Sequence, residues 1–147
     1  MLKRWGLACT IAVLSAAPAW AETSCGYEPI APALPSVAEL GEKSATEAMQ
    51  AKHMAFEDIK TWQSSLKDYR SCLDSDQADV KRQLQSTKSQ PQPDAEKIKH
   101  LQDQLTGDGQ AYDKSTDSEE KIVNDFHALS TAYCARSDTD KTTCPKS

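Results

Sequence analysis

Three histidines, His53, His100 and His127, are the only side chains in the chain whose ordinary pKa lies close to neutral pH. No Ser/His/Asp order can be recognised around them, and the chain has neither a glycine-rich phosphate loop nor a zinc-type pair of cysteines. The acidic residues are scattered along the chain, as they are on the solvated faces of helices. The sequence therefore predicts a protein that is not an enzyme.

One group of side chains has the types and the spacing for binding a metal. Met49, His53 and Met54 lie within about a turn and a half of a predicted helix. In one of the two helix pairings considered below, His127 lies nearly opposite His53. Thioether and imidazole groups are ligands that copper accepts. In the simpler interpretation, which we adopt, the methionines fill gaps beside the core and the histidines face water, so that no metal or other cofactor is predicted and copper is the alternative.

The first 21 residues have the pattern of a cleavable signal peptide. Lys3 and Arg4 precede an apolar run, and residues 19–21 (AWA) fit the small-x-small cleavage site, which predicts a cut after Ala21. A retained membrane anchor is the alternative, but the run is shorter than the roughly 20 apolar residues that a membrane span requires. We expect an exported protein without a stable membrane anchor.

Cleavage after Ala21 leaves 126 residues, a length that suits one domain. The signal peptide contains two basic and no acidic residues, so 15 basic residues remain against 22 acidic ones, a net charge of −7. Such a chain has no electrostatic attraction to nucleic acid or to anionic lipid. Trp62 is its only tryptophan and large apolar residues are few. We expect an elongated helical fold with a thin core and no room for a pocket of usual size.

Seam residues recur at alternating spacings of three and four in two long runs, the pattern of a coiled-coil seam. Between the runs, residues 89–94 (SQPQPD) are the strongest helix breaker of the mature chain. Capping-box patterns predict a long helix that begins at Ala45 and a short helical turn that begins at Val37 and breaks near Gly41. The seam positions are Ala45, Ala48, Lys52, Ala55, Ile59, Trp62, Leu66, Tyr69, Leu73, Asp76 and Val80, then Ile98, Leu101, Leu105, Asp108, Tyr112, Ser115, Glu119, Ile122, Phe126, Leu129 and Tyr133.

These elements predict an all-α fold, an elongated antiparallel helical hairpin at residues 45–137. A proline-rich strap and a short helical turn precede it at 22–44, and a C-terminal tail follows at 138–147. Gly107 and Gly109 weaken the second helix, because each glycine inside a helix costs about 1 kcal/mol relative to alanine. We expect the second helix to be kinked or broken there. The polar composition before the loop predicts that the loop end is the least stable part of the hairpin.

Two registers of the hairpin keep one seam against the other, and the residue numbers of facing positions then sum to about 181 or about 188. The sequence does not choose between them. The first register pairs Ile59 with Ile122 and Tyr69 with Tyr112, and the second pairs Trp62 with Phe126 and Leu66 with Ile122.

Three stretches of the chain resemble a group of small, uncharacterised exported helical proteins of Gram-negative bacteria. They are CGYEPIAPALP from Cys25, YRSCLD from Tyr69 and IVNDFHALSTAYCARS from Ile122. The group has a Cys-Gly-Tyr-x-Pro mature start, a Tyr-x-x-Cys-Leu motif and a helix that ends near Ala-Tyr-x-Ala-Arg. Cys134 and Cys144 depart from this pattern. The resemblance implies a periplasmic location and a helical fold, and it implies no activity.

Four cysteines follow the signal peptide, and export to an oxidising compartment predicts two disulfides. A link from Cys72 to Cys134 disagrees with both registers, whereas a link from Cys25 to Cys134 together with one from Cys72 to Cys144 is harder to exclude. A helix that begins at Ala45 places Cys72 about 41 Å along it, and the extended segment back to Cys25 spans up to about 63 Å. We predict the pairs Cys25–Cys72 and Cys134–Cys144.

Pro29, Pro32 and Pro35 then form a polyproline-like strap that lies along the helices. We expect it to cover apolar surface with Tyr27, Ile30 and Leu34.

The absence of site chemistry and the amphipathic helices together predict a scaffold, an adaptor or a chaperone-like binder that acts by contact with another protein. A module that binds a small ligand or copper through Met49, His53, Met54 and His127 is the alternative. Because a two-helix hairpin leaves the sides of its seam uncovered, Phe56 and Val123 are expected to face a second copy in a weak homodimer.

Overall fold

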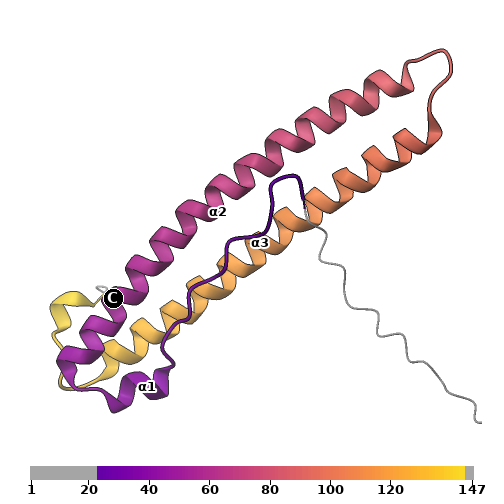
Figure 1. Cartoon of the computed structure of the whole chain (residues 1–147). Helices are drawn as coiled ribbons and strands as arrows, with labels where there is room; N and C mark the ends of the chain where they lie inside the picture. Colours follow the sequence, from indigo (N-terminus) through magenta and orange to yellow (C-terminus); the bar gives the residue numbers. More distant parts are fainter. Residues whose placement is uncertain (1–22, 145–147) are drawn as a thin grey trace, which may run out of the picture.

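The computed structural model describes residues 23–144, and it confirms the all-α hairpin (Figure 1). Two long helices, α2 and α3, run antiparallel and are joined by a short loop at one end of the molecule. The short helix α1 and the C-terminal segment lie at the opposite end. The predicted signal peptide lies outside the described residues. The elements are α1 Val37–Glu42, α2 Ala45–Lys88, α3 Ala95–Ala135 and the 3-10 helix η1 Lys141–Thr143.

Both predicted capping boxes are present at the helix starts. At α2, the backbone N–H of Glu47 donates to the Ser44 hydroxyl and the backbone N–H of Ser44 donates to the Glu47 carboxylate. Ser36 and Glu39 make the same pair of bonds at α1. Each bond satisfies a backbone donor that a helix start otherwise leaves without a partner, so the sequence fixes the points at which these helices begin.

Helix α3 is continuous through Gly107 and Gly109, so the alternative that it divides into two helices there is wrong. Leu101, Asp108 and Ser115 are buried on one side of α3, both before and after the glycines. This in-phase packing of α3 against α2 offsets the roughly 1 kcal/mol that each glycine costs within a helix.

The buried positions of the hairpin are seam positions predicted from the heptad pattern, with Thr87 as an addition. One cluster gathers Ala48, Ala55, Leu129 and Tyr133 with Leu40 of α1, and a second gathers Ile59, Trp62, Leu66 and Ile122. Ile122 therefore shares a cluster with Ile59 and with Leu66, the partners that the two registers assigned to it. This cluster therefore contains partners from both registers and does not single out one of them.

The proline strap follows the predicted path along the hairpin, but two of its three predicted contacts are wrong. Tyr27 and Ile30 are 72% and 93% exposed, whereas Leu34 packs against both core clusters and Ala31 packs against the second. An extended polyproline strand has three residues per turn, so residues 27, 30, 33 and 36 share one face, which is the exposed one. Leu34 lies on a different face and cannot point the same way as Tyr27 and Ile30.

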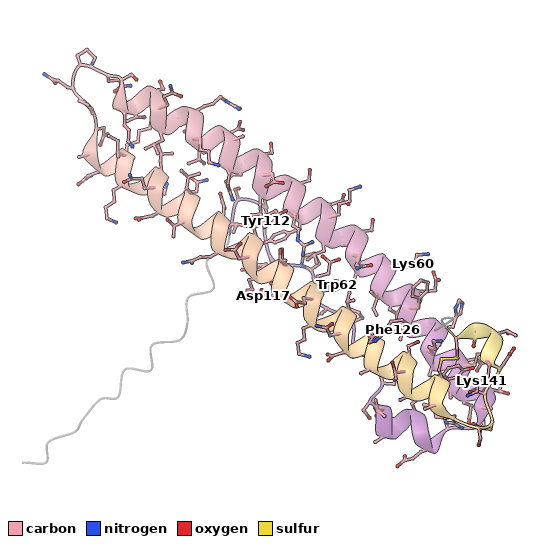
Figure 2. All side chains as sticks on the ribbon, turned by 180° about the vertical axis from the view of Figure 1, so that it is seen from behind. Lys60, Trp62, Tyr112, Asp117, Phe126 and Lys141 are labelled. Carbon is pink, nitrogen blue, oxygen red and sulfur yellow. A yellow bond between two sulfur atoms is a disulfide. The ribbon has the colours of Figure 1, made fainter. Side chains whose placement is uncertain are left out.

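Three contacts fasten the strap to the helices. The Cys25–Cys72 disulfide joins its start to the middle of α2, as predicted, with the two Cα atoms 5.8 Å apart. The indole N–H of Trp62 donates to the carbonyl of Pro29 at 3.0 Å, and the ammonium of Lys114 lies 3.1 Å from the Glu28 carboxylate. Figure 2 shows Trp62 near the middle of the hairpin and Phe126 toward the end that carries the C-terminal segment. The strap thus connects both long helices.

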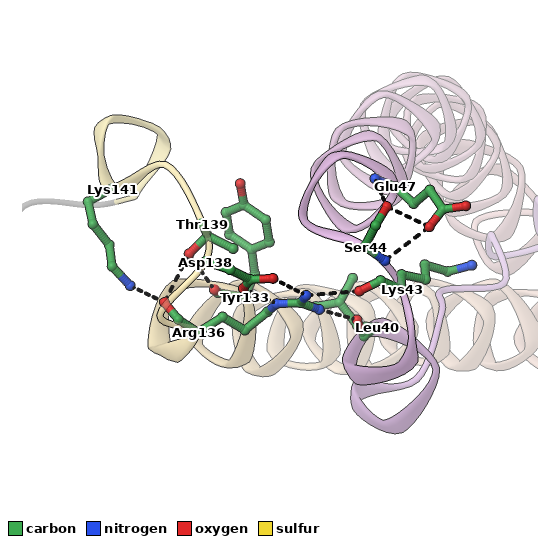
Figure 3. Close-up of polar contacts among 9 residues, drawn as sticks. All are labelled: Leu40, Lys43, Ser44, Glu47, Tyr133, Arg136, Asp138, Thr139 and Lys141. Carbon is green, nitrogen blue, oxygen red and sulfur yellow. Dashed lines mark hydrogen bonds and ion pairs between the residues drawn. The ribbon is translucent and has the colours of Figure 1, made fainter.

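Arg136 holds α1 against the end of α3 (Figure 3). Its guanidinium donates to the carbonyl of Leu40 at 2.6 Å and to that of Lys43 at 2.8 Å, and it pairs with Asp138 at 2.8 Å. The Leu40 and Lys43 carbonyls lie at the C-terminal end of α1, where a helix leaves acceptors without partners. These bonds fix α1 at the end of the hairpin opposite the loop, where the C-terminal segment folds back.

Candidate functional site

An apolar groove of about 590 Å³ lies at the end of the hairpin opposite the loop, between α2, α3 and the C-terminal segment. Helix α2, helix α3 and the segment around η1 each contribute lining residues. The lining residues are Met49, Gln50, Lys52, His53, Phe56, Phe126, Ser130, Thr142, Thr143 and Cys144.

Two phenylalanines give the groove its apolar surface. Phe56 of α2 and Phe126 of α3 have ring centroids 5.9 Å apart with tilted planes. Phe126 packs against both core clusters, whereas Phe56 is 44% exposed, and Met49 beside it is exposed as well. Large apolar side chains of this kind, held on rigid helices, can accept the side chains of a binding partner.

The C-terminal segment lines the groove because two interactions fold it back. The Cys134–Cys144 disulfide, which the sequence predicted, joins the end of α3 to the end of η1 with the Cα atoms 5.8 Å apart. Lys141 donates to the carbonyls of Cys134 and Arg136 and so satisfies acceptors at the C-terminal end of α3. Residues 142–144 are thereby held beside α2.

Lys52 supplies the positive charge of the groove. Its ammonium donates to the Thr143 carbonyl at 3.1 Å and lies 4.7 Å from the centroid of the Tyr133 ring. Burial lowers the pKa of Lys52, because a desolvated ammonium loses part of its hydration. Lys52 and His53 are the lining residues that can carry positive charge, and no acidic residue lines the groove. The groove therefore differs in charge from the acidic protein around it.

The structure brings together only two of the four residues that the alternative of a copper site requires. Met49 and His53, one helical turn apart on α2, both line the groove, whereas Met54 and His127 are exposed and do not line it. Within residues 23–144, no group of three or more His, Cys, Asp or Glu side chains could hold a metal ion. The prediction that no pocket of usual size would form is wrong, because the groove lies outside the core, where the tail folds back onto the hairpin.

Lys52 and Phe126 were predicted only as seam positions, and Gln50, Ser130, Thr142 and Thr143 were not singled out. The short spacing of Cys134 and Cys144 was the one signal for this part of the lining, since a local disulfide turns the tail back on the helix that precedes it.

A polar network crosses the middle of the seam. The Arg70 guanidinium donates to the Ser115 hydroxyl at 2.7 Å and to the Glu119 carboxylate at 2.5 Å, and Gln63 also donates to Glu119, at 2.7 Å. The hydrogen bond from Arg70 lowers the pKa of Glu119, despite partial burial. Because these groups bind one another, the network positions α3 on α2 and offers no free nucleophile or base.

No protein-family model matches the chain, and no curated protein or solved structure is similar enough to count as a match. None of the helices in the described part of the chain is both long and apolar enough to span a membrane.

Proposed function

We propose that this protein is a non-enzymatic periplasmic binder that acts by contact with another protein, as a scaffold, an adaptor or a chaperone-like binder. The groove is its contact surface. The observation that supports this function is an open apolar groove with two phenylalanines on an otherwise polar, acidic hairpin. The two disulfides support export to an oxidising compartment.

The lining of the groove defines the chemistry of the partner. An apolar side chain fits against Phe56, Phe126 and Met49, and an adjacent carboxylate of the partner is attracted by Lys52. A volume of about 590 Å³ suits a few side chains rather than a folded domain. The partner is therefore a short peptide segment of another protein that carries a large apolar residue beside an acidic one.

The test of this function is a crosslink combined with a matched pair of substitutions. A photoreactive phenylalanine analogue in place of Met49 is expected to trap a partner of defined mass in periplasmic extract, whereas the same analogue in place of the exposed Asp117 is not. Phe56→Asp is expected to reduce trapping at least about tenfold, because it places a carboxylate on the apolar lining of the groove.

Val123→Asp is the matched control, since Val123 is 45% exposed, as Phe56 is 44% exposed, but does not line the groove. Equal trapping from positions 49 and 117, or equal losses in the two variants, would contradict the proposed function. The proposed weak homodimer through Phe56 and Val123 is a separate matter. Sedimentation that gives only the monomer mass at high micromolar concentration would exclude it.

Copper binding is the second candidate function, and one observation favours it. Met49 and His53 line the same groove, so a thioether and an imidazole are available together. If this candidate is correct, calorimetric titration with Cu(I) gives a saturable heat that His53→Gln abolishes and His127→Gln leaves intact. A titration without saturable heat is the result that the protein-binding function predicts.

A further inference from the structure

Two carboxyl groups meet in the buried seam, one from each long helix. Asp108 of α3 is 2% exposed, and its Oδ2 atom has no hydrogen-bond partner within the described part of the chain. Asp76 of α2 lies in hydrogen-bonding contact with Asp108 and accepts a hydrogen bond of 2.9 Å from the Gln104 side chain. A buried carboxylate oxygen without a donor is costly, and two ionised carboxylates in contact repel each other.

Among the described residues, none of the groups that act on the pKa of Asp76 or of Asp108 is a cation. Asp76 and Asp108 act on each other, and the hydrogen-bonding groups that act on Asp76 are Ser24, from the strap, and Gln104, from α3. A single proton shared by the two carboxyl groups removes the repulsion between them. Protonated Asp108 donates a hydrogen bond to ionised Asp76 and removes one of the two charges.

The part of the hairpin that is most weakly packed runs from residue 73 through the loop to residue 108, and we call it the outer segment. The carboxyl pair lies at the end of this segment that is farther from the loop. The buried side chains Leu73, Val80 and Leu101 of the outer segment belong to neither core cluster. The Cys25–Cys72 disulfide and the Arg70 network fix the hairpin on the other side of the pair. A local opening of the outer segment therefore leaves the rest of the fold in place.

We propose that Asp76 and Asp108 form a proton-binding latch, in which one proton shared by the two carboxyls holds the outer segment closed and its loss allows that segment to open. The latch is independent of the groove, which lies at the other end of the hairpin. It makes the conformation of an exported protein responsive to the pH outside the cytoplasm.

The pKa values of the pair agree in direction with this arrangement. Burial and the contact with Asp76 raise the pKa of Asp108 from 3.8 to about 6. Burial also acts to raise the pKa of Asp76, but hydrogen bonds from Ser24, Gln104 and Asp108 together keep it below its ordinary value. The closed segment thus binds the Asp108 proton more tightly than the open one, and closure weakens as the pH rises from about 4 through about 6.

Amide hydrogen exchange tests the latch in the intact protein. After correction for intrinsic exchange rates, protection at residues 80–88 and 95–101 is expected to fall roughly fiftyfold between pH 4 and pH 8, since each pKa unit is worth a factor of ten. Amides at residues 55–66, in the second core cluster, serve as the internal reference. Their protection is expected to change far less.

Asp108→Asn imitates the protonated carboxyl, because the amide donates to Asp76 and has no charge to lose. In this variant, protection of the outer segment is expected to be high and independent of pH. Asp117→Asn removes an exposed carboxyl of α3 and is expected to keep the wild-type pH dependence. Protection that is flat in the wild type, or unchanged in pH dependence by Asp108→Asn, would overturn the latch.

A second measurement covers the case in which Asp108→Asn does not fold. The carboxyl carbon-13 resonance of Asp108 in the wild-type protein is expected to titrate near pH 6, two units above an ordinary aspartate. A midpoint close to pH 4 would reject the shared proton by itself.

Discussion

Replacing both Cys25 and Cys72 with serine is expected to lower the free energy of unfolding by about 4 kcal/mol. The two cysteines are 47 residues apart in the sequence, and opening their link restores to the unfolded chain the entropy that a loop of this length loses on closure. For a chain of this size the loss corresponds to a melting temperature about 15 °C lower, measured by circular dichroism at 222 nm. The remaining seam keeps the helices associated, so the variant is expected to fold.

The second disulfide is the control for this result. Cys134 and Cys144 are 10 residues apart, and the same chain-entropy relation gives about 3 kcal/mol for the loss of their link. The two variants are also expected to lose structure in different parts of the molecule. Only the Cys134→Ser/Cys144→Ser variant releases residues 142–144, which line the groove. If removing the Cys25–Cys72 link changed the melting temperature less than removing the Cys134–Cys144 link, the strap would not be the main covalent support of the fold.

The parts of the fold that were predictable are those set by local chemistry and by helical periodicity. Ser44 and Glu47 determine where α2 begins through bonds that span three residues, so the sequence contains the whole signal. The heptad pattern likewise placed Leu66, Ile122 and Leu129 in the core, because residues spaced by three and four share one face of a helix.

The predictions that were wrong required knowledge of what packs against each element. Gly107 and Gly109 have poor helix propensity, but tertiary packing of the seam on both sides of them decides the outcome. In the strap, helical reasoning does not apply, and the period of three places Tyr27 and Ile30 outward.

Only some of the residues of the candidate site could be predicted from the sequence. Met49 and His53 were identified because i and i+4 positions share a helix face, which depends on α2 alone. Lys52 and Phe126 line the groove together with residues 142–144, and no periodicity describes a tail that folds back. Asp108 was placed in the seam by the heptad pattern, but its contact with Asp76 depends on the helix register, which the sequence left open.

Trp62→Ala is expected to lower the free energy of unfolding by about 3–5 kcal/mol, because it removes the largest side chain of the second core cluster. Trp62 is 5% exposed, lies among Ile59, Leu66 and Ile122, and also donates to the Pro29 carbonyl. Trp62→Phe separates these two roles, since phenylalanine keeps most of the apolar packing but cannot donate. It is expected to cost about 1–2 kcal/mol, as measured by urea unfolding with circular dichroism.

The cost of Trp62→Phe is expected to depend on the disulfide that fastens the strap. With Cys25–Cys72 intact, the strap stays close to α2 and the Pro29 carbonyl loses its donor in a half-buried place. Without the disulfide, the strap can detach from the cluster and hydrate that carbonyl, so the same substitution is expected to cost at least about 0.5 kcal/mol less. Equal costs of Trp62→Phe in the two backgrounds would contradict this coupling. The strap would then be held by the packing of Ala31 and Leu34 on the core rather than by its bond to Trp62.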